Sequence, residues 1–269
     1  MNIGIIGAGN IGSVLARLFH SVGHKVVIAN SRGPETLSDL ARETGAAAVS
    51  LLEAADGVDC IVITIPMKNV PTLPKNLLAH LPTDSPIIDT GNYYPLRDGR
   101  IREIDEGMIE SEWTGRVLGH PVLKAFNNIT AYSLANKGSV KGSKNRIALP
   151  VSGDDIRSKQ VVLELLDQIG FDPYDAGALA DSWRYQPGTP AYCPDPTLRQ
   201  LPELLLKADR AKGPRNRDQA AKMMAKVPNL PPSELVRLAR LSAGLDTLNP
   251  KTWLAVLRLG FAVLGSSGH

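Results

Sequence analysis

The sequence predicts an α/β fold: a Rossmann-type, doubly wound and mostly parallel sheet, followed by an all-helical C-terminal region. Short apolar runs alternate with helix-like segments through the first two-thirds of the chain, which is typical of a parallel sheet. The run at 58–65 is almost continuously apolar, as expected of a strand covered on both faces. Beyond residue 181, prolines mark an irregular connection, and the pattern after it is helical. We therefore expect a nucleotide-binding domain at 1–180 and a helical region at 181–269.

The expected elements follow the apolar runs in order. Strands are expected at 1–6, 25–29, 47–50, 58–65, 86–89, 122–125 and 146–152, with an edge strand at 173–175, where proline is tolerated. A helix with apolar residues from 14 to 22 follows the first strand, and further helices are expected at 34–44, 70–80 and 154–169. The C-terminal helices are expected at 198–212, 216–226, 232–245 and 250–264.

The composition is that of a globular protein. The 269 residues are 43% hydrophobic and 21% charged, and the two cysteines provide neither a disulfide framework nor the spacing of a metal site. The longest apolar stretch, 253–265, contains Arg258 and is too short to span a bilayer. The chain begins directly on a strand, which leaves no room for a signal peptide. We therefore expect a cytoplasmic protein with no membrane partner and no metal.

Charge is unevenly distributed along the chain. Residues 197–269 contain 12 Lys and Arg against 5 Asp and Glu, whereas the formal net charge of the whole chain is only +3. Such a basic segment can meet an anionic ligand or partner, or it can simply form solvated helix faces. Aromatic residues do not interleave with the basic ones, so no nucleic acid is expected as a partner.

A glycine-rich turn lies between the first strand and the first helix. The glycines Gly7, Gly9 and Gly12 fit the spacing Gly-x-Gly-x-x-Gly, and their position between strand and helix is that of the dinucleotide fingerprint. In this motif the first glycine forms the tight turn, the second lets the backbone approach the pyrophosphate, and the third allows helix and strand to pack closely. The N-terminus of the helix then offers N–H groups to the phosphates.

The end of the second strand indicates which dinucleotide is bound. NAD enzymes usually carry Asp or Glu about 20 residues after the glycine turn, for the 2′-hydroxyl of the ribose. This chain instead has Ser31 and Arg32, a hydroxyl and a guanidinium that suit a 2′-phosphate. The sequence therefore predicts NADP as cofactor and a redox enzyme.

Polar residues follow the later strands, where ligands bind in open α/β sheets. Asn92 follows the fifth strand and Asn127 the sixth, and we expect both at the nicotinamide, together with Pro66, Met67 and Lys124. The neighbours of Lys124 place it inside the strand, so we expect it to point away. Asn92 can also belong to a turn, and the adjacent amides after strand six can cap a helix. No histidine–carboxylate pair stands out, so the sequence predicts catalysis by alignment rather than by acid–base chemistry.

Taken together, these segments resemble the NADPH-dependent coenzyme F420 reductase family, which is deazaflavin-linked, and they are related to the NADPH-binding domain of ferric reductases. The likeness covers residues 1 to about 193. The segments that carry it are 5–12, 29–34, 65–66, 89–95, 123–127 and 175–177. The resemblance implies that NADP is bound by Gly9, Asn10, Ile11, Ser31, Arg32, Ile65 and Pro66, and that a deazaflavin stacks on the nicotinamide.

The expected function is hydride transfer between NADPH and a planar acceptor, coenzyme F420. Three alternatives stay open: reduction of a flavin, reduction of an imine or small carbonyl compound, and a non-catalytic NADPH-binding module. The tail is longer than expected of compact family members. Its last helix carries apolar residues that we expect to be buried against the sheet or against a second subunit in a homodimer. These residues are Trp253, Leu254, Leu257, Phe261 and Leu264.

Overall fold

The computed structural model describes residues 1–265, with side chains described as far as residue 259. A six-stranded parallel sheet has the strand order β3-β2-β1-β4-β5-β6, in which the chain crosses over between β3 and β4. This is the strand order of the dinucleotide-binding fold and confirms the predicted class. The strands are β1 (Asn2–Ile6), β2 (Lys25–Ala29), β3 (Ala47–Ala48), β4 (Cys60–Ile63), β5 (Ile87–Asp89) and β6 (Leu123–Lys124).

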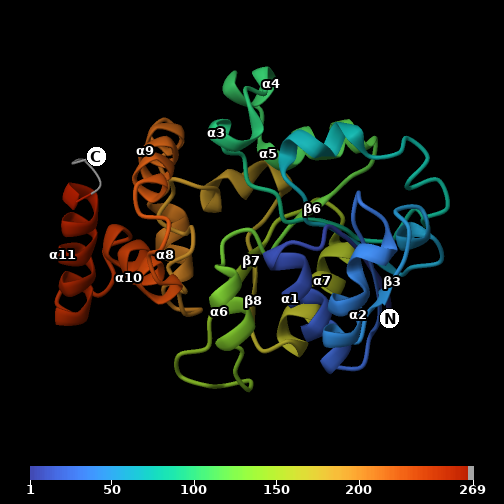
Figure 1. Ribbon diagram of the computed structural model, residues 1–269, viewed down its shortest axis with the longest axis horizontal. Coiled ribbons are helices and arrows are strands. Elements are labelled where there is room, and N and C mark those ends of the chain that lie inside the picture. The colour runs from blue at the N-terminus through green and yellow to red at the C-terminus, as the bar shows by residue number, and fades with distance from the viewer. Residues whose placement is uncertain (266–269) are drawn as a thin grey trace.

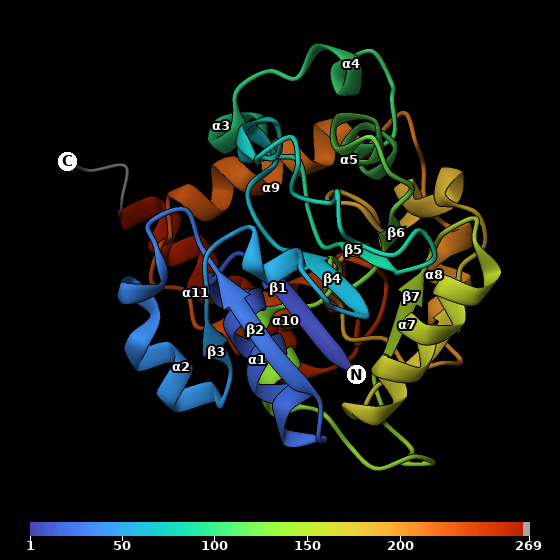
Figure 2. The same cartoon turned by 90° about the vertical axis from the view of Figure 1, so that its right-hand side faces the viewer.

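Successive residues of the central strands point to opposite faces of the sheet, and both faces are buried. On one face Ile3, Ile5 and Val62 pack in a core shared with helices α1 (Asn10–Ser21), α6 (Ala131–Asn136) and α7 (Ile156–Gln168). On the other, Ile6 and Ile63 pack against η2 (Glu53–Ala55) and the segment around 77–81. Figure 2 shows α2 (Ser38–Thr44), which follows η1 (Pro34–Leu37), on the side of β3, and α7 on the opposite side.

The last two strands form a small sheet of their own. β7 (Ala148–Val151) pairs in parallel with β8 (Asp172–Asp175). This pair meets the main sheet through one antiparallel bridge, in which the N–H groups of Lys124 and Ser152 each donate to the other's carbonyl, at 2.8 and 3.1 Å. The expected run of strands is therefore present, but the edge of the main sheet is β6.

Between β4 and β6 the structure differs from the sequence-based expectation. The helix expected at 70–80 is instead a short 3-10 helix, η3 (Met67–Thr72), followed by turns. Pro71 and Pro74 lack the N–H that an α-helix requires, which explains the irregular backbone. The region 95–118, for which the sequence predicted no element, contains α3 (Pro95–Asp98), α4 (Arg102–Asp105) and α5 (Glu110–Leu118).

The C-terminal part is helical, as predicted, and lies to one side of the sheet in Figure 1. It comprises η4 (Leu179–Tyr185), α8 (Leu201–Leu206), α9 (Gly213–Ala225), α10 (Pro232–Ser242) and α11 (Pro250–Gly265). Leu201, Leu204 and Ala243 share a core with Ala148 of β7 and Tyr185 of η4. The single helix expected at 198–212 ends early, and the chain turns before α9.

The last helix does not bury the expected apolar side chains on the sheet. Trp253, Leu254 and Leu257 are 51%, 52% and 58% exposed, because α11 packs on α10 through the other side of the helix. The expected sheet contact is therefore wrong for these three residues. The side chains of residues 261 and 264 lie outside the described part. No described helix has the length and apolarity needed to cross a membrane.

Candidate functional site

Each glycine of the first turn has its own structural reason. Gly7 has a φ of +114°, a conformation that L side chains rarely adopt. A Cβ on Gly12 would lie 1.9 Å from the carbonyl oxygen of Gly7, so only glycine allows α1 to pack this closely. By contrast, a Cβ on Gly9 would meet no described atom within 4 Å. Gly9 therefore borders open space, where a pyrophosphate can approach the backbone.

Helix α1 begins at this turn without a capping side chain. Gly9 is its N-cap residue, and the first turn carries no acidic side chain. The first N–H groups of a helix have no partner within the helix, and the helix dipole makes this end attractive to anions. Asn10 and Ile11, which the family resemblance implies as cofactor residues, lie at this end of the helix. The local chemistry suits a phosphate.

A groove of about 420 Å³ runs from the glycine turn across the ends of β1, β2 and β4. Ser31 and Arg32 reach it from β2, and both are exposed. The Asn30 side chain fixes the backbone there, since its Oδ1 accepts the N–H of Arg32 at 2.9 Å and its Nδ2 donates to Thr36. The predicted cofactor residues in the lining are Gly7, Gly9, Ser31, Arg32, Ile65 and Pro66. The fold thus brings together residues from three strand ends.

Asn92 and Asn127, the predicted nicotinamide contacts, are hydrogen-bonded to each other. Nδ2 of Asn92 donates to the carbonyl of Asn127 at 2.9 Å, and Nδ2 of Asn127 donates to Oδ1 of Asn92 at 3.2 Å. Nδ2 of Asn127 also donates to the carbonyl of Tyr185, at 3.0 Å. The buried Oδ1 of Asn127 has no hydrogen-bond partner among the described residues. The tail segment therefore helps to hold the amide after β6.

The backbone around Asn127 is strained. Phe126, fully buried, has a φ of +60°, which is rare for a bulky residue. Cys193 has a φ of +63° and donates its N–H to the carbonyl of Asn128 at 2.9 Å. Strained residues of this kind persist only where the surroundings enforce them, and they concentrate at functional sites. The loop after β6 is therefore a candidate site on conformational grounds as well.

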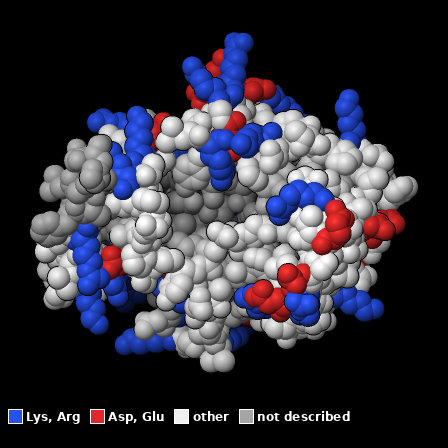
Figure 3. Space-filling model, in the orientation of Figure 1, with Lys and Arg blue, Asp and Glu red and all other residues white. Residues whose placement is uncertain are grey.

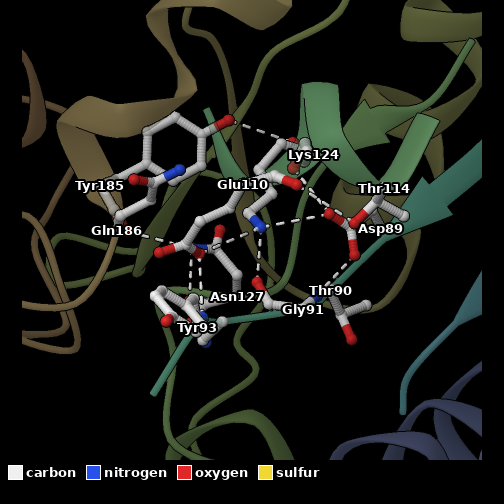
Figure 4. Close-up of polar contacts among 12 residues, drawn as sticks. Asp89, Thr90, Gly91, Tyr93, Glu110, Thr114, Lys124, Asn127, Tyr185 and Gln186 are labelled. Carbon is white, nitrogen blue, oxygen red and sulfur yellow. Dashed lines mark hydrogen bonds and ion pairs between the residues drawn. The ribbon is translucent and has the colours of Figure 1, made fainter. Parts of the chain in front are cut away.

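A cluster of buried charges lies beside these amides (Figure 4). Lys124, fully buried, directs its Nζ to Oδ2 of Asp89 at 3.3 Å, to the carbonyl of Gly91, and to within 3.9 Å of Oε2 of Glu110. Ser111 donates to the same oxygen of Asp89 at 2.6 Å. The ammonium of Lys124 is directed toward the carboxylates at the end of β5 and on α5. That Lys124 points away from the nicotinamide stays a prediction.

Glu110 is the group that the sequence did not single out. Burial raises the pKa of its carboxyl to about 7, although the charge of Lys124 and the N–H of Tyr93, which donates to Oε2 at 3.1 Å, act to lower it. A group with such a pKa exchanges a proton near neutral pH. Its only sequence signal was a glutamate opening a short amphipathic segment, which is common at the start of helices.

Two tyrosines, one after β5 and one from the tail, meet at this region. The hydroxyl of Tyr94 donates to that of Tyr192 at 2.8 Å, and Nδ2 of Asn92 lies 3.4 Å from the same Tyr192 oxygen. Burial raises the pKa of both phenols. They therefore act as neutral hydrogen-bonding groups.

Figure 3 shows that the molecule is hollowed between the tail helices and the sheet side, with Lys and Arg on the upper rim.

The chain is similar to proteins of a known oxidoreductase family. Residues 2–93 match the family described as NADP oxidoreductase, coenzyme F420-dependent. A crystal structure of the hypothetical protein SMa0349 from Sinorhizobium meliloti is 30% identical, with a TM-score of 0.57, over 67% of this chain and 86% of that one. The chain belongs to this NADP oxidoreductase family. It therefore belongs among the NAD(P)-dependent oxidoreductases, and the resemblance seen in the sequence is confirmed.

This member of the NADP oxidoreductase family is similar to two further proteins. A structure from Arthrobacter sp. FB24, named "putative f420 dependent nadp-reductase", shares the fold with 21% identity and a TM-score of 0.56, over 68% of this chain and 87% of that one. The Escherichia coli K12 protein YjhV is 47% identical over 55 residues, which is 20% of this chain and 40% of YjhV. The match thus spans well under half the length of that curated relative.

The described residues contain no group of three or more His, Cys, Asp or Glu arranged to hold a metal ion.

Proposed function

We propose that this chain is an NADPH-dependent oxidoreductase that transfers hydride between NADPH and a planar acceptor, coenzyme F420. The observation that carries the proposal is the groove in which Ser31 and Arg32 lie beside an uncapped glycine turn. The end of β2 offers the amide of Asn30, the hydroxyl of Ser31 and the guanidinium of Arg32, where an NAD site would offer a carboxylate. These groups suit the 2′-phosphate of NADPH.

The residues present fit a dinucleotide. The open space at Gly9 admits a pyrophosphate, and the N-terminus of α1 attracts it. We propose that Gly7, Gly9, Asn10, Ile11 and Gly12 hold the phosphates, that Ser31 and Arg32 hold the 2′-phosphate, and that Ile65 and Pro66 border the sugar. When bound, the nicotinamide supplies or accepts hydride at its C4 atom.

Asn92 and Asn127 are proposed to align the reacting rings. Both lie at the carboxyl ends of the strands, and the strained loop and the Tyr185 carbonyl hold Asn127 in place. Reduction of a deazaflavin takes up one hydride and one proton. Because hydride passes directly between two rings, alignment carries most of the catalytic effect.

A second candidate, reduction of an imine or a small carbonyl compound, is favoured by Glu110. These substrates need a positioned proton donor, and a carboxyl with a pKa of about 7 meets that need. An acceptor screen separates the candidates. Purified protein is mixed with NADPH and, in separate cuvettes, coenzyme F420, a free flavin, and cyclic imines or small aldehydes, and the absorbance of NADPH and acceptor is followed. We expect turnover with the deazaflavin. Turnover only with another acceptor, or with none, would refute the proposal.

Cofactor choice has its own test. A charge-assisted hydrogen bond contributes about 1.5–3 kcal/mol, or roughly ten- to a hundredfold in Kd, and the exposed position of Arg32 favours the lower value. We expect wild type to bind NADPH more than tenfold tighter than NADH, and Arg32→Ala to lose NADPH affinity while keeping that for NADH. The matched control is Arg42→Ala, on exposed α2 and outside the groove. Equal wild-type affinity for the two dinucleotides contradicts the assignment.

We also propose a homodimer formed through α11. Trp253, Leu254 and Leu257 are each about half exposed on this helix, and contiguous apolar patches on a monomer are uncommon. Light scattering during size-exclusion chromatography measures the mass directly. A wild-type mass of one chain at micromolar concentration would refute the dimer.

A further inference from the structure

A second cavity lies between the Rossmann part and the tail. Its volume is about 130 Å³, and its walls come from the α4–α5 connection, from η4 and the turn after it, and from the start of α9. It shares no lining residue with the dinucleotide groove. One water occupies about 10–15 Å³ by this measure, so the space holds a ligand of roughly a dozen heavy atoms. We call it the tail crevice.

One wall of the tail crevice is formed by Arg217 of α9. This arginine is only 7% exposed, and its guanidinium lies over the ring of Tyr93 at 4.9 Å. Its Nε donates to Asp218 at 2.8 Å, whereas its two terminal nitrogens have no acceptor among the described residues. Arg217 thus pairs with Asp218 through Nε only, and the planar fork of its terminal nitrogens matches a carboxylate. It lines the cavity with these two nitrogens available to an anion.

The acidic residues of the crevice are mostly occupied by other partners. Asp105 accepts the Tyr93 hydroxyl at 3.1 Å and pairs with Arg100. Asp209 accepts the N–H groups of two residues directly before α9 and pairs with Lys212. Both carboxylates are thus neutralised by neighbours. Glu110 also lines the cavity; its Oε2 forms an ion pair with Lys124 at 3.9 Å, and the charge of Arg217 acts on the same carboxyl.

The remaining wall is apolar and aromatic. Trp183 of η4 lines the crevice, with the guanidinium of Arg210 at 5.9 Å from its ring and that of Arg184 at 4.6 Å. Met108, Pro187 and Pro214 complete this side. Nη2 of Arg210 donates to the carbonyl of Gly107 at 2.8 Å, which ties the tail to the α4–α5 connection. A ligand here meets the guanidinium of Arg217 and the side chain of Trp183, both of which line the cavity.

We propose that the tail crevice binds a small carboxylic acid with an apolar body, its carboxylate on Arg217 and its body against Trp183. The site lies apart from the dinucleotide groove, and it gives the basic tail a specific ligand rather than only solvated faces. It does not depend on which acceptor receives the hydride.

Three probes of one size test the proposal: benzoate, benzyl alcohol and benzylamine, titrated into the full-length protein by calorimetry and by tryptophan fluorescence. We expect benzoate to bind at least tenfold tighter than the alcohol. Arg217→Gln should lose at least tenfold in benzoate affinity, whereas Arg215→Gln, an exposed arginine of the same helix, should not. NADPH affinity should be the same in all three proteins, which separates this site from the dinucleotide site.

Trp183→Leu provides an independent variant, since Arg217 also packs on Tyr93 and its replacement can affect folding. This variant should weaken benzoate severalfold and leave acetate unchanged, because only the apolar body contacts the indole. Benzoate that binds no better than benzyl alcohol overturns the proposal. Preferential binding of benzylamine also overturns it, because the ligand would then be a cation held by Glu110.

Discussion

Replacing Glu110 by glutamine tests the buried charge cluster most directly. The carboxyl is 3% exposed, accepts the N–H of Tyr93, and lies 3.9 Å from the ammonium of Lys124. Glutamine keeps the size and the acceptor oxygen but removes the ionisation. The change therefore isolates the energetic consequence of holding an ionisable carboxyl at this position.

The size of the effect follows from the pKa of Glu110, which burial raises from 4.5 to about 7. Because the folded state holds the proton more tightly than the unfolded state, this carboxyl stabilises the fold below pH 4.5 and loses that contribution as the pH rises through 7. Integration of this proton linkage between pH 5 and pH 8 gives a loss of about 2.5 kcal/mol. The glutamine variant has no such loss. The stability of wild type relative to Glu110→Gln should therefore fall by about this amount.

The assay is urea denaturation followed by circular dichroism at pH 5, 6, 7 and 8, on wild type, Glu110→Gln and Glu112→Gln. Glu112 is an exposed glutamate of the same helix, so its variant should follow wild type at each pH. A difference between wild type and Glu110→Gln that stays constant within about 0.5 kcal/mol over this range would refute the reasoning. It would mean that Lys124 keeps the carboxylate ionised throughout.

Three further predictions concern the proposed site and the tail. Gly9→Val should fold normally but lose NADPH binding, as measured by fluorescence titration. Gly12→Val should also lower Tm, because its Cβ would lie 1.9 Å from the Gly7 carbonyl oxygen. Normal NADPH binding by Gly9→Val would rule out the turn as the phosphate site. Asn127→Ala should lower kcat more than it weakens NADPH binding, the pattern of an interaction made mainly in the transition state, and steady-state kinetics with a titrated Kd tests this. Weaker NADPH binding with an unchanged kcat would assign Asn127 to binding alone. Deleting the chain from Pro250 onward should yield aggregated or monomeric protein with impaired turnover. Light scattering measures the mass and an activity assay measures the turnover. An active, soluble protein of unchanged mass would contradict this prediction.

Features that depend on local sequence were predictable. The alternation of apolar runs and helical patterns predicted the parallel sheet, and the spacing of Gly7, Gly9 and Gly12 predicted a turn in which each glycine has a separate reason. The family resemblance rested on short segments around this turn and at later strand ends, and it is confirmed. These features can be read from the sequence because each of them depends only on residues that are close together in the chain.

Prediction failed where short elements depend on contacts from elsewhere in the chain. The three helices at 95–118 are each too short to show a clear period. The longest of them, α5, packs against η3 and against η4 of the tail, and α4 packs on α5. The same loss of local signal explains why Glu110 was missed. The groups that act on its carboxyl are Lys124 of β6, the Tyr93 N–H and Arg217 of α9, which come from three separate parts of the chain.

The sequence by itself determined the class of fold, the family and the expected cofactor residues of the first 66 positions, because a strand, a glycine turn and a helix are encoded by neighbours. Only the tertiary structure decided which way Lys124 points, that Glu110 joins it, and that Arg217 reaches a cavity beside Trp183. A side chain in a buried strand turns toward whichever charges the rest of the fold brings to it. Those charges here are Asp89 and Glu110, which end β5 and open α5, and burial of the resulting cluster raises the pKa of Glu110.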